Sequence, residues 1–133
     1  MNATAVWRGE ERFEVESDGG RTVMLDGSKE HTAGPSPMQM VLAALCACTS
    51  VDVVGILQKK RELLEGLTVA AAADRSPGPP SVFTHIHLTY KIRGAVSQKA
   101  AEDAVSLSKN KYCSVSKMLE KAVTIDYSIE YES

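Results

Sequence analysis

Three cysteines are the residues of this chain with the clearest capacity for chemistry. Cys48 lies in an apolar stretch, and Cys113 follows 65 residues later between Lys111 and Lys117. A thiolate is a strong nucleophile and metal ligand, whereas a neutral thiol is a poor one. Cys113 stands at an expected helix start, where the helix dipole stabilises a thiolate. Cys113 is therefore a candidate reactive thiol, and an N-cap cysteine without chemical function is the equally open alternative.

The other two cysteines have simpler interpretations from spacing alone. Free cysteine is among the most buried residue types, so a small side chain filling a helix interface is the first interpretation of Cys48. Cys46 precedes it by two residues and on a helix points about 200° away, which indicates packing. A functional pair of Cys48 and Cys113 requires Cα atoms less than about 7 Å apart, which spacing in the sequence does not establish.

Two histidines form a weaker candidate site. His85 and His87 share one face of an expected strand, and together with Cys46 and Cys48 they are residue types that bind zinc. Their spacing matches no standard zinc motif, so we expect no metal site and prefer an exposed strand face. The sequence also lacks the common motifs of phosphate loops, dinucleotide-binding folds, zincins and α/β-hydrolases.

The elements that must position these residues follow an α+β pattern. Alternating polar and apolar residues predict strands over residues 4–8, 12–16, 22–25, 67–73, 82–93 and 123–131. A long helix is expected from Met38 to about Glu65, with shorter helices over 98–109 and from near Cys113. This segregation of strands and helices favours a largely antiparallel sheet, in a single domain over residues 1–133.

The long helix has a clear start signal and an apolar first half. Ser36 and Gln39 have the spacing of a capping box, and Pro37 suits the first helical position. Gly66 is expected to end the helix. Up to about Val54 the helix is apolar nearly all round, which indicates burial on most sides.

Composition and charge limit the class of partner. The 133 residues include 15 Lys and Arg against 17 Asp and Glu, a net charge of −2. Nucleic acids and anionic membranes attract concentrated positive charge, so neither is expected as a partner. The longest unbroken apolar run, residues 40–48, is shorter than the 20 or so residues of a membrane span. No secretory signal begins the chain, and a cytoplasmic location is expected.

Several of these features together resemble the OsmC/Ohr family. The segment Pro35–Cys48 is similar to that family's P-x-x-L/M-x-x-A-A helix entry, which leads to a cysteine in a central helix. The segment Cys113–Ser116 resembles its C-P-x-S motif, and Trp7, the strand Phe83–Leu88 and the element order also fit. The resemblance covers nearly the whole chain. It implies antiparallel sheets around a buried central helix, in an intertwined homodimer with both cysteines at the subunit interface.

The resemblance also implies an activity. It indicates a cysteine peroxidase of organic hydroperoxides in peroxide or osmotic stress defence, with no bound cofactor. Cys48 would be the peroxidatic residue, Cys113 the resolving residue, and an external dithiol the reductant. Met38, Leu45 and Tyr112 are expected to contact the substrate. A non-catalytic protein that binds a small hydrophobic ligand or senses redox state is the alternative.

The chain departs from the family at the charges around the thiol. A buried thiolate needs a neighbouring cation, because desolvation otherwise raises its pKa. The peroxidases use an Arg that a Glu orients, but Met38 stands at the position of that Glu and Gln39 beside it is uncharged. Ser114 also replaces the motif proline. These departures put fast peroxide turnover in doubt more than the fold.

Candidates for the missing charges lie elsewhere in the chain. Arg21 is our first choice for the thiolate-stabilising cation, ahead of Arg8 and Arg12 in the same strands. Asp52 follows Cys48 by one helical turn and, being negative, would oppose a thiolate on its own. A carboxylate there either pairs with a cation or serves as a structural hydrogen-bonding group.

Overall fold

The computed structural model describes residues 1–132 and divides by its internal contacts into two compact units. The first unit is Met1–Ala43, and the second begins at Ala44. Each unit contains a three-stranded sheet, and strands and helices do not alternate regularly along the chain. The expected α+β class is therefore confirmed. The single domain expected over residues 1–133 stays a prediction.

The first unit is a β meander that ends in an anchored loop. Strands β1 (Ala3–Trp7), β2 (Arg12–Ser17) and β3 (Thr22–Asp26) pair antiparallel in that order, close to the predicted ranges. Asp26 is buried, and its carboxylate accepts hydrogen bonds from the backbone N–H groups of Ser28 and Ala33. These bonds, led by those from Ser28, lower the pKa of Asp26 to about 2, so the loop after β3 is held by an ionised group.

Helix α1 (Pro37–Lys59) starts as predicted and ends earlier than predicted. At its start the Ser36 N–H donates to Gln39 Oε1 and the Gln39 N–H donates to Ser36 Oγ, which confirms the capping box. At its end Arg61 adopts a left-handed φ of 59°, and the Glu62 N–H donates to the Leu57 carbonyl. This is a Schellman termination with arginine at the position that glycine usually occupies. The expected stop at Gly66 is therefore wrong.

The second unit holds a mixed sheet in the order β4 (Leu63–Arg75), β5 (Phe83–Ala95), β6 (Thr124–Glu132). Strands β4 and β5 are antiparallel, whereas β5 and β6 are parallel. A parallel pair requires a long crossover, which here consists of α2 (Gln98–Leu107), a π-helical turn η1 (Ser108–Tyr112) and α3 (Ser114–Leu119). The sheets are thus largely antiparallel, as expected, with this one exception.

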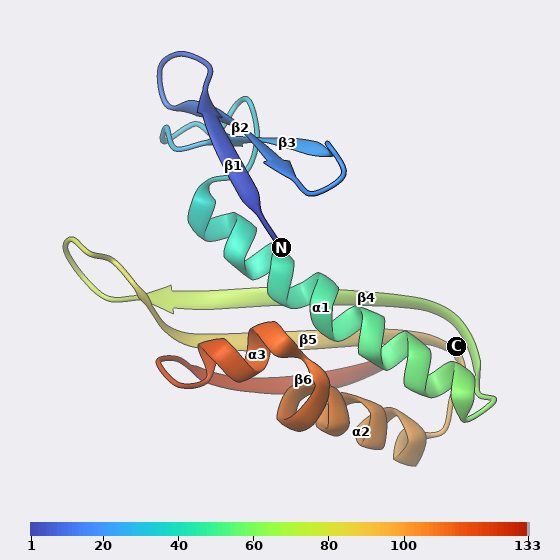
Figure 1. The fold of residues 1–133 in the computed structure, drawn as a ribbon. Helices are drawn as coiled ribbons and strands as arrows, with labels where there is room; N and C mark the ends of the chain where they lie inside the picture. The colour runs from blue at the N-terminus through green and yellow to red at the C-terminus, as the bar shows by residue number, and fades with distance from the viewer. Residues whose placement is uncertain (133) are drawn as a thin grey trace. The chain divides into compact units, whose positions relative to one another are not determined.

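The core of the second unit lies between its sheet and its helices, which cover one face of the sheet (Figure 1). Alternate residues of β5 are buried, since successive side chains of a strand point to opposite faces. The buried side chains of β5 and α2 are Phe83, Ile86, Leu88, Tyr90, Ile92, Ala100, Ala101, Ala104 and Val105. Helix α1 contributes one stripe at four-residue spacing, Leu45, Thr49, Val53 and Leu57.

Within one chain, α1 is buried on this stripe only. Val51, on another side of the helix, is 73% exposed, so the burial on most sides expected from its composition is not reached in a single chain. Of the helices in residues 1–132, α1 alone is long and apolar enough to cross a membrane by length and composition. The count of unbroken apolar residues missed this property because Thr49, Ser50 and Asp52 interrupt the run. Core helices pass the same test, and the buried stripe of α1 is typical of one.

Candidate functional site

The structure brings Cys48 and Cys113 together. Cys48 lies in α1 and is half-buried, and Cys113 is the fully buried residue that caps α3. The two thiols are close enough for the Cys48 thiol to raise the pKa of Cys113. The Cys113 N–H also donates to the Ser108 carbonyl at 2.8 Å, which ties Cys113 to the first residue of η1. The crossover between the parallel strands is what carries Cys113 to α1.

Burial dominates the protonation of Cys113. It raises the pKa of the Cys113 thiol to about 11, even though the Ser116 N–H donates to the sulfur at 3.4 Å and lowers the pKa. The Cys48 thiol and the Asp52 carboxylate raise it further. Of the two interpretations left open for Cys113, the raised pKa favours a neutral N-cap thiol in the resting protein, because α3 has only six residues and desolvation outweighs its N–H groups.

Cys46 does not belong to this pair. It is half-buried two residues before Cys48, and burial raises the pKa of its thiol. Its packing role, expected from the sequence, agrees with that environment.

Three buried hydroxyls and one carboxylate form a continuous hydrogen-bonded chain beside the two thiols. Tyr90 Oη lies 2.7 Å from Thr49 Oγ1, and Thr49 Oγ1 lies 2.7 Å from Ser108 Oγ. Ser108 Oγ then donates to Asp52 Oδ2 at 2.8 Å. Tyr90, Thr49 and Ser108 are at most 1% exposed. Of the two roles open for Asp52, this contact supports the hydrogen-bonding one, and within residues 1–132 Asp52 forms no ion pair.

The direction of this chain follows from proton counting. An ionised carboxylate only accepts, so the Ser108 proton points to Asp52. Each hydroxyl has one proton, so Thr49 must donate to Ser108, and Tyr90 must donate to Thr49. Burial raises the pKa of Tyr90 to about 12, against the opposing effect of its Thr49 hydrogen bond, which keeps the phenol protonated as the first donor. No sequence pattern singled out Tyr90, Thr49 or Ser108, because each looks like an ordinary strand or helix residue.

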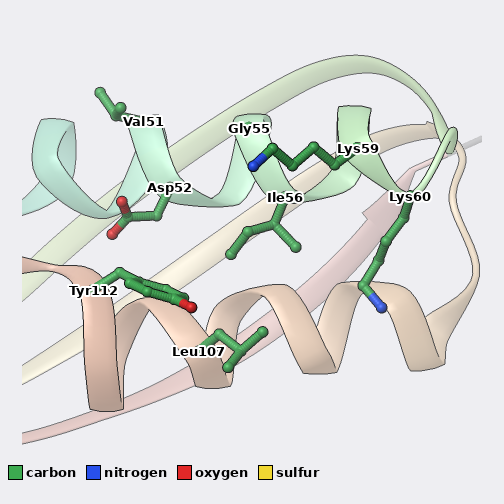
Figure 2. Close-up of a pocket in the computed structure, with 8 residues that line it drawn as sticks. All are labelled: Val51, Asp52, Gly55, Ile56, Lys59, Lys60, Leu107 and Tyr112. Atoms are coloured by element: carbon green, nitrogen blue, oxygen red, sulfur yellow. The ribbon is translucent and has the colours of Figure 1, made fainter.

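A cavity of about 520 Å³ opens next to Asp52. Its walls come from α1, the end of α2 and η1, and Figure 2 shows Asp52 and Tyr112 at one end and Lys60 at the other. The lining residues are Val51, Asp52, Gly55, Ile56, Lys59, Lys60, Leu107 and Tyr112. The cavity is mostly apolar, with a carboxylate at one end, the Lys60 ammonium at the other and the Lys59 ammonium between them (Figure 2).

The residues expected to contact a substrate are distributed unevenly around this cavity. Tyr112 lines it and is 51% exposed. Leu45 does not: it is fully buried in the α1 stripe that faces the sheet, and a side chain without exposed surface offers a substrate no contact. Met38 is half-buried in the first turn of α1, and Arg21 is exposed just before β3. Both belong to the first unit, and their roles stay predictions.

The histidines of β5 have other partners than zinc. His85 Nε2 lies 2.8 Å and His87 Nδ1 2.5 Å from the two oxygens of Asp126 on β6, and His87 Nε2 lies 3.0 Å from Ser128 Oγ. In the part of the chain that the structure describes, no three His, Cys, Asp or Glu side chains are placed to hold a metal ion. The zinc alternative therefore has no structural support.

Two neighbouring thiols, one on a long helix and one at the start of a short helix, on an α+β fold with a mixed sheet, define the class of protein. Comparison with known proteins identifies the family. The family model described as OsmC-like protein matches residues 27–128. The chain is 42% identical to protein YhfA of Escherichia coli K12 over 131 residues, which covers 98% of this chain and 97% of that protein. The chain therefore belongs to the OsmC-like family.

Solved structures agree with this assignment. A hypothetical protein from Aquifex aeolicus VF5 superposes with a TM-score of 0.85 at 28% identity, covering 99% of this chain and 97% of the other. An organic hydroperoxide resistance protein OsmC from Legionella pneumophila superposes with a TM-score of 0.73 at 21% identity, covering 97% and 95%. The second similarity shows a shared fold.

Proposed function

We propose that this chain is a cysteine-based peroxidase that reduces organic hydroperoxides in the cytoplasm. The observation that carries the proposal is the proximity of the Cys48 and Cys113 thiols, which interact with each other beside a mostly apolar cavity. Membership of the OsmC-like family and the fold shared with an organic hydroperoxide resistance protein support it.

In the first step the Cys48 thiolate attacks one oxygen of the hydroperoxide. The O–O bond breaks, the alkoxide takes a proton and leaves as an alcohol, and Cys48 is oxidised to a sulfenic acid. Cys48 is the better candidate for this attack because Cys113 is fully buried and its pKa is raised to about 11. A buried thiolate needs a neighbouring cation, and Arg21 stays the predicted one for Cys48.

In the second step Cys113 resolves the sulfenic acid. Its sulfur displaces the sulfenic oxygen as water and forms a disulfide with Cys48. An external dithiol then reduces this disulfide by exchange and is itself oxidised, which returns both protein thiols. The substrate's organic group would occupy the cavity next to Asp52, with Tyr112 in contact with it.

A homodimer is part of the proposal. Large apolar side chains around the cavity and α3 stay exposed in one chain, namely Val51, Leu107, Tyr112 and Met118. Exposed apolar groups in such a cluster are typical of an interface. Light scattering on the purified protein is expected to give twice the mass of the 14.3 kDa chain, and a stable monomer at micromolar concentration would remove this part of the proposal.

A ligand-binding protein without turnover is the second candidate. Met38 in place of the family's Glu, and a neutral Cys113, both favour it over a fast peroxidase. The cavity would then hold a small hydrophobic molecule, and the two thiols would sense redox state.

Thiol counting separates the two candidates. Reduced protein is mixed with a slight excess of cumene hydroperoxide, and free thiols are titrated after quenching. The peroxidase is expected to lose two of its three thiols rapidly, with a Cys48–Cys113 disulfide in the peptide map. Slow, unspecific loss would support the binder instead.

Three single substitutions complete this experiment. Cys48→Ser is expected to abolish peroxide consumption, and Cys113→Ser to let Cys48 proceed to the sulfinic acid. Cys46→Ser is the matched control, since it removes a thiol of the same helix that lies outside the pair. If Cys48→Ser consumes peroxide at the wild-type rate, the proposed function is wrong.

A further inference from the structure

The Asp52 carboxylate is held beside both thiols by independent contacts. It follows Cys48 by one turn of α1, so the two side chains share a helix face. Ser108 Oγ donates to its Oδ2 at 2.8 Å, and the Ser108 carbonyl accepts from the Cys113 N–H, also at 2.8 Å. One residue therefore ties the carboxylate and Cys113 to the same place.

The Asp52 carboxylate has acceptor positions left at which it can take up a proton. A carboxylate has about four acceptor positions, and Ser108 occupies one of them. Asp52 also lines the cavity, so the group is reachable from the space assigned to the substrate. By contrast, Cys113 is buried as a neutral thiol and must lose its proton before its sulfur can attack.

We propose that Asp52 accepts the proton of Cys113 in the step that closes the Cys48–Cys113 disulfide. The inference rests on the proposed function. As the Cys113 S–H bond breaks, its proton passes to Asp52 and the sulfur forms a bond to the Cys48 sulfur. The S–O bond of the sulfenic acid breaks, and the departing oxygen takes the proton from Asp52 to leave as water. Asp52 is ionised again at the end.

The buried hydroxyls are positioning residues in this step. Ser108 orients the carboxylate, Thr49 donates to Ser108, and Tyr90 donates to Thr49. Because the donors run in one direction toward Asp52, they hold Ser108, and with it the carboxylate, in one orientation beside Cys113.

If Asp52 acted only through its negative charge, it would slow disulfide closure instead of assisting it. The negative carboxylate raises the pKa of Cys113, so a purely electrostatic role means that its removal makes Cys113 easier to ionise. Neutralising Asp52 would then accelerate disulfide closure, whereas loss of a proton acceptor slows it. The sign of the change distinguishes the two roles.

The test measures disulfide closure with an oxidant other than peroxide. Oxidised glutathione forms a mixed disulfide with Cys48. The Cys113 sulfur then attacks the Cys48 sulfur, closes the protein disulfide and releases glutathione as the thiol. Acid quenching and mass spectrometry follow both species. In Asp52→Asn the closure step is expected to slow about 100-fold, as for loss of a general base. Formation of the mixed disulfide is timed separately in chains that also contain Cys113→Ser, so that a change in that step is recognised.

Two further variants guard against a folding artefact. Asp52→Glu keeps a carboxylate and is expected to recover part of the closure rate. Asp74→Asn neutralises an exposed carboxylate of β4 that lies 3.5 Å from His85 and does not line the cavity, and is expected to close at the wild-type rate.

The pH profile supplies a readout that a structural role does not move. The ionisable groups around Asp52 are Cys48 on α1, Cys113 before α3, Tyr112 of η1, and Lys59 and Lys60 along the cavity. In Asp52→Asn, hydroxide must remove the Cys113 proton, so the deficit is expected to shrink as the pH rises. A deficit that stays constant with pH, or closure in Asp52→Asn as fast as in the wild type or faster, overturns the proposal.

Failure of this inference differs from failure of the proposed function. Slow closure of Asp52→Asn with oxidised glutathione, in a protein that does not reduce peroxide, would keep the Asp52 assignment and remove the peroxidase. If Asp52→Asn reduces peroxide and closes the disulfide at the wild-type rate, the peroxidase is kept and the Asp52 assignment is removed.

Discussion

Strand β5 presents polar side chains on both of its faces, and the two faces follow different rules. On the inner face Tyr90 is fully buried and begins the hydrogen-bonded chain to Asp52. On the outer face His85 is 37% exposed and shares Asp126 with His87. On the inner face, a buried polar group without a hydrogen-bond partner costs free energy, because water cannot replace the partner. Each hydroxyl proton there therefore has one acceptor. Outside, water replaces any partner that is lost.

The comparison indicates where polar contacts specify the structure. The inner hydroxyls fix the direction of every donor and, with it, the orientation of one carboxylate. The hydrogen bonds of the outer cluster have similar lengths, but they constrain the fold little, because exposed ion pairs contribute little to the free energy of folding. Substitutions of equal size on the two faces are therefore expected to differ strongly in effect.

The largest effect is expected for Thr49→Val, which keeps the shape and removes the middle hydroxyl. The buried Tyr90 hydroxyl then loses its acceptor and Ser108 loses a donor. We expect the free energy of unfolding to fall by about 2–3 kcal/mol, measured by urea denaturation. Thr49→Ser retains the hydroxyl and is the control for the polar part of the loss. Equal destabilisation by both variants would mean that packing, not the hydrogen bonds, holds this chain together.

A smaller effect is expected for Tyr90→Phe. It removes the first donor and leaves the contacts from Thr49 to Ser108 and from Ser108 to Asp52 intact. The free energy of unfolding is expected to fall by about 1 kcal/mol, the usual contribution of one neutral hydrogen bond. A loss as large as that of Thr49→Val would contradict the inferred direction of the chain, in which Tyr90 only donates.

The smallest effect is expected on the outer face, and it depends on pH. The hydrogen bond to Asp126 raises the pKa of His85 above 6.5, and those from His85 and His87 lower the pKa of Asp126 below 3.8. The His85 contribution is complete below pH 6.5 and is lost as the pH rises through the folded pKa. The Asp126 contribution is present above pH 3.8 and is lost on acidification. Both are present together between these values.

His85→Gln is therefore expected to lower the urea midpoint slightly at pH 5.5 and not at all at pH 9. Lys91→Gln, an exposed change on the same strand, controls for altered surface charge. A large destabilisation at pH 9 would show that the outer cluster constrains the fold as the inner one does.

The sequence predicted most of the elements because their signals are local. The capping box of Ser36 and Gln39 and the alternation along β5 identify a helix start and a strand without knowledge of the rest of the chain. The end of α1 was misplaced because Arg61 occupies a left-handed position that the pattern assigns to glycine. The parallel pairing of β6 was also not predicted, since it depends on where the crossover packs.

The candidate site was predicted in part. Cys48 and Cys113 stand out by residue type, and the family motifs relate them, but their contact depends on a topology that no spacing encodes. Thr49, Ser108 and Tyr90 were missed because an isolated hydroxyl has no pattern; only burial reveals that each must find a partner. Leu45 was misassigned because the apolar helix does not show which stripe faces the sheet.

The two cysteines are distant in sequence, because strands β4 and β5 and helix α2 lie between them. A covalent bond between Cys48 and Cys113 would close a loop of about 65 residues, and such a cross-link restricts the unfolded chain by an entropy worth about 4 kcal/mol at room temperature. Oxidised protein would consequently melt at a higher temperature than reduced protein. By the same linkage, folding favours the bond, so the more the bond raises the melting temperature, the lower the reduction potential of the pair in the folded protein.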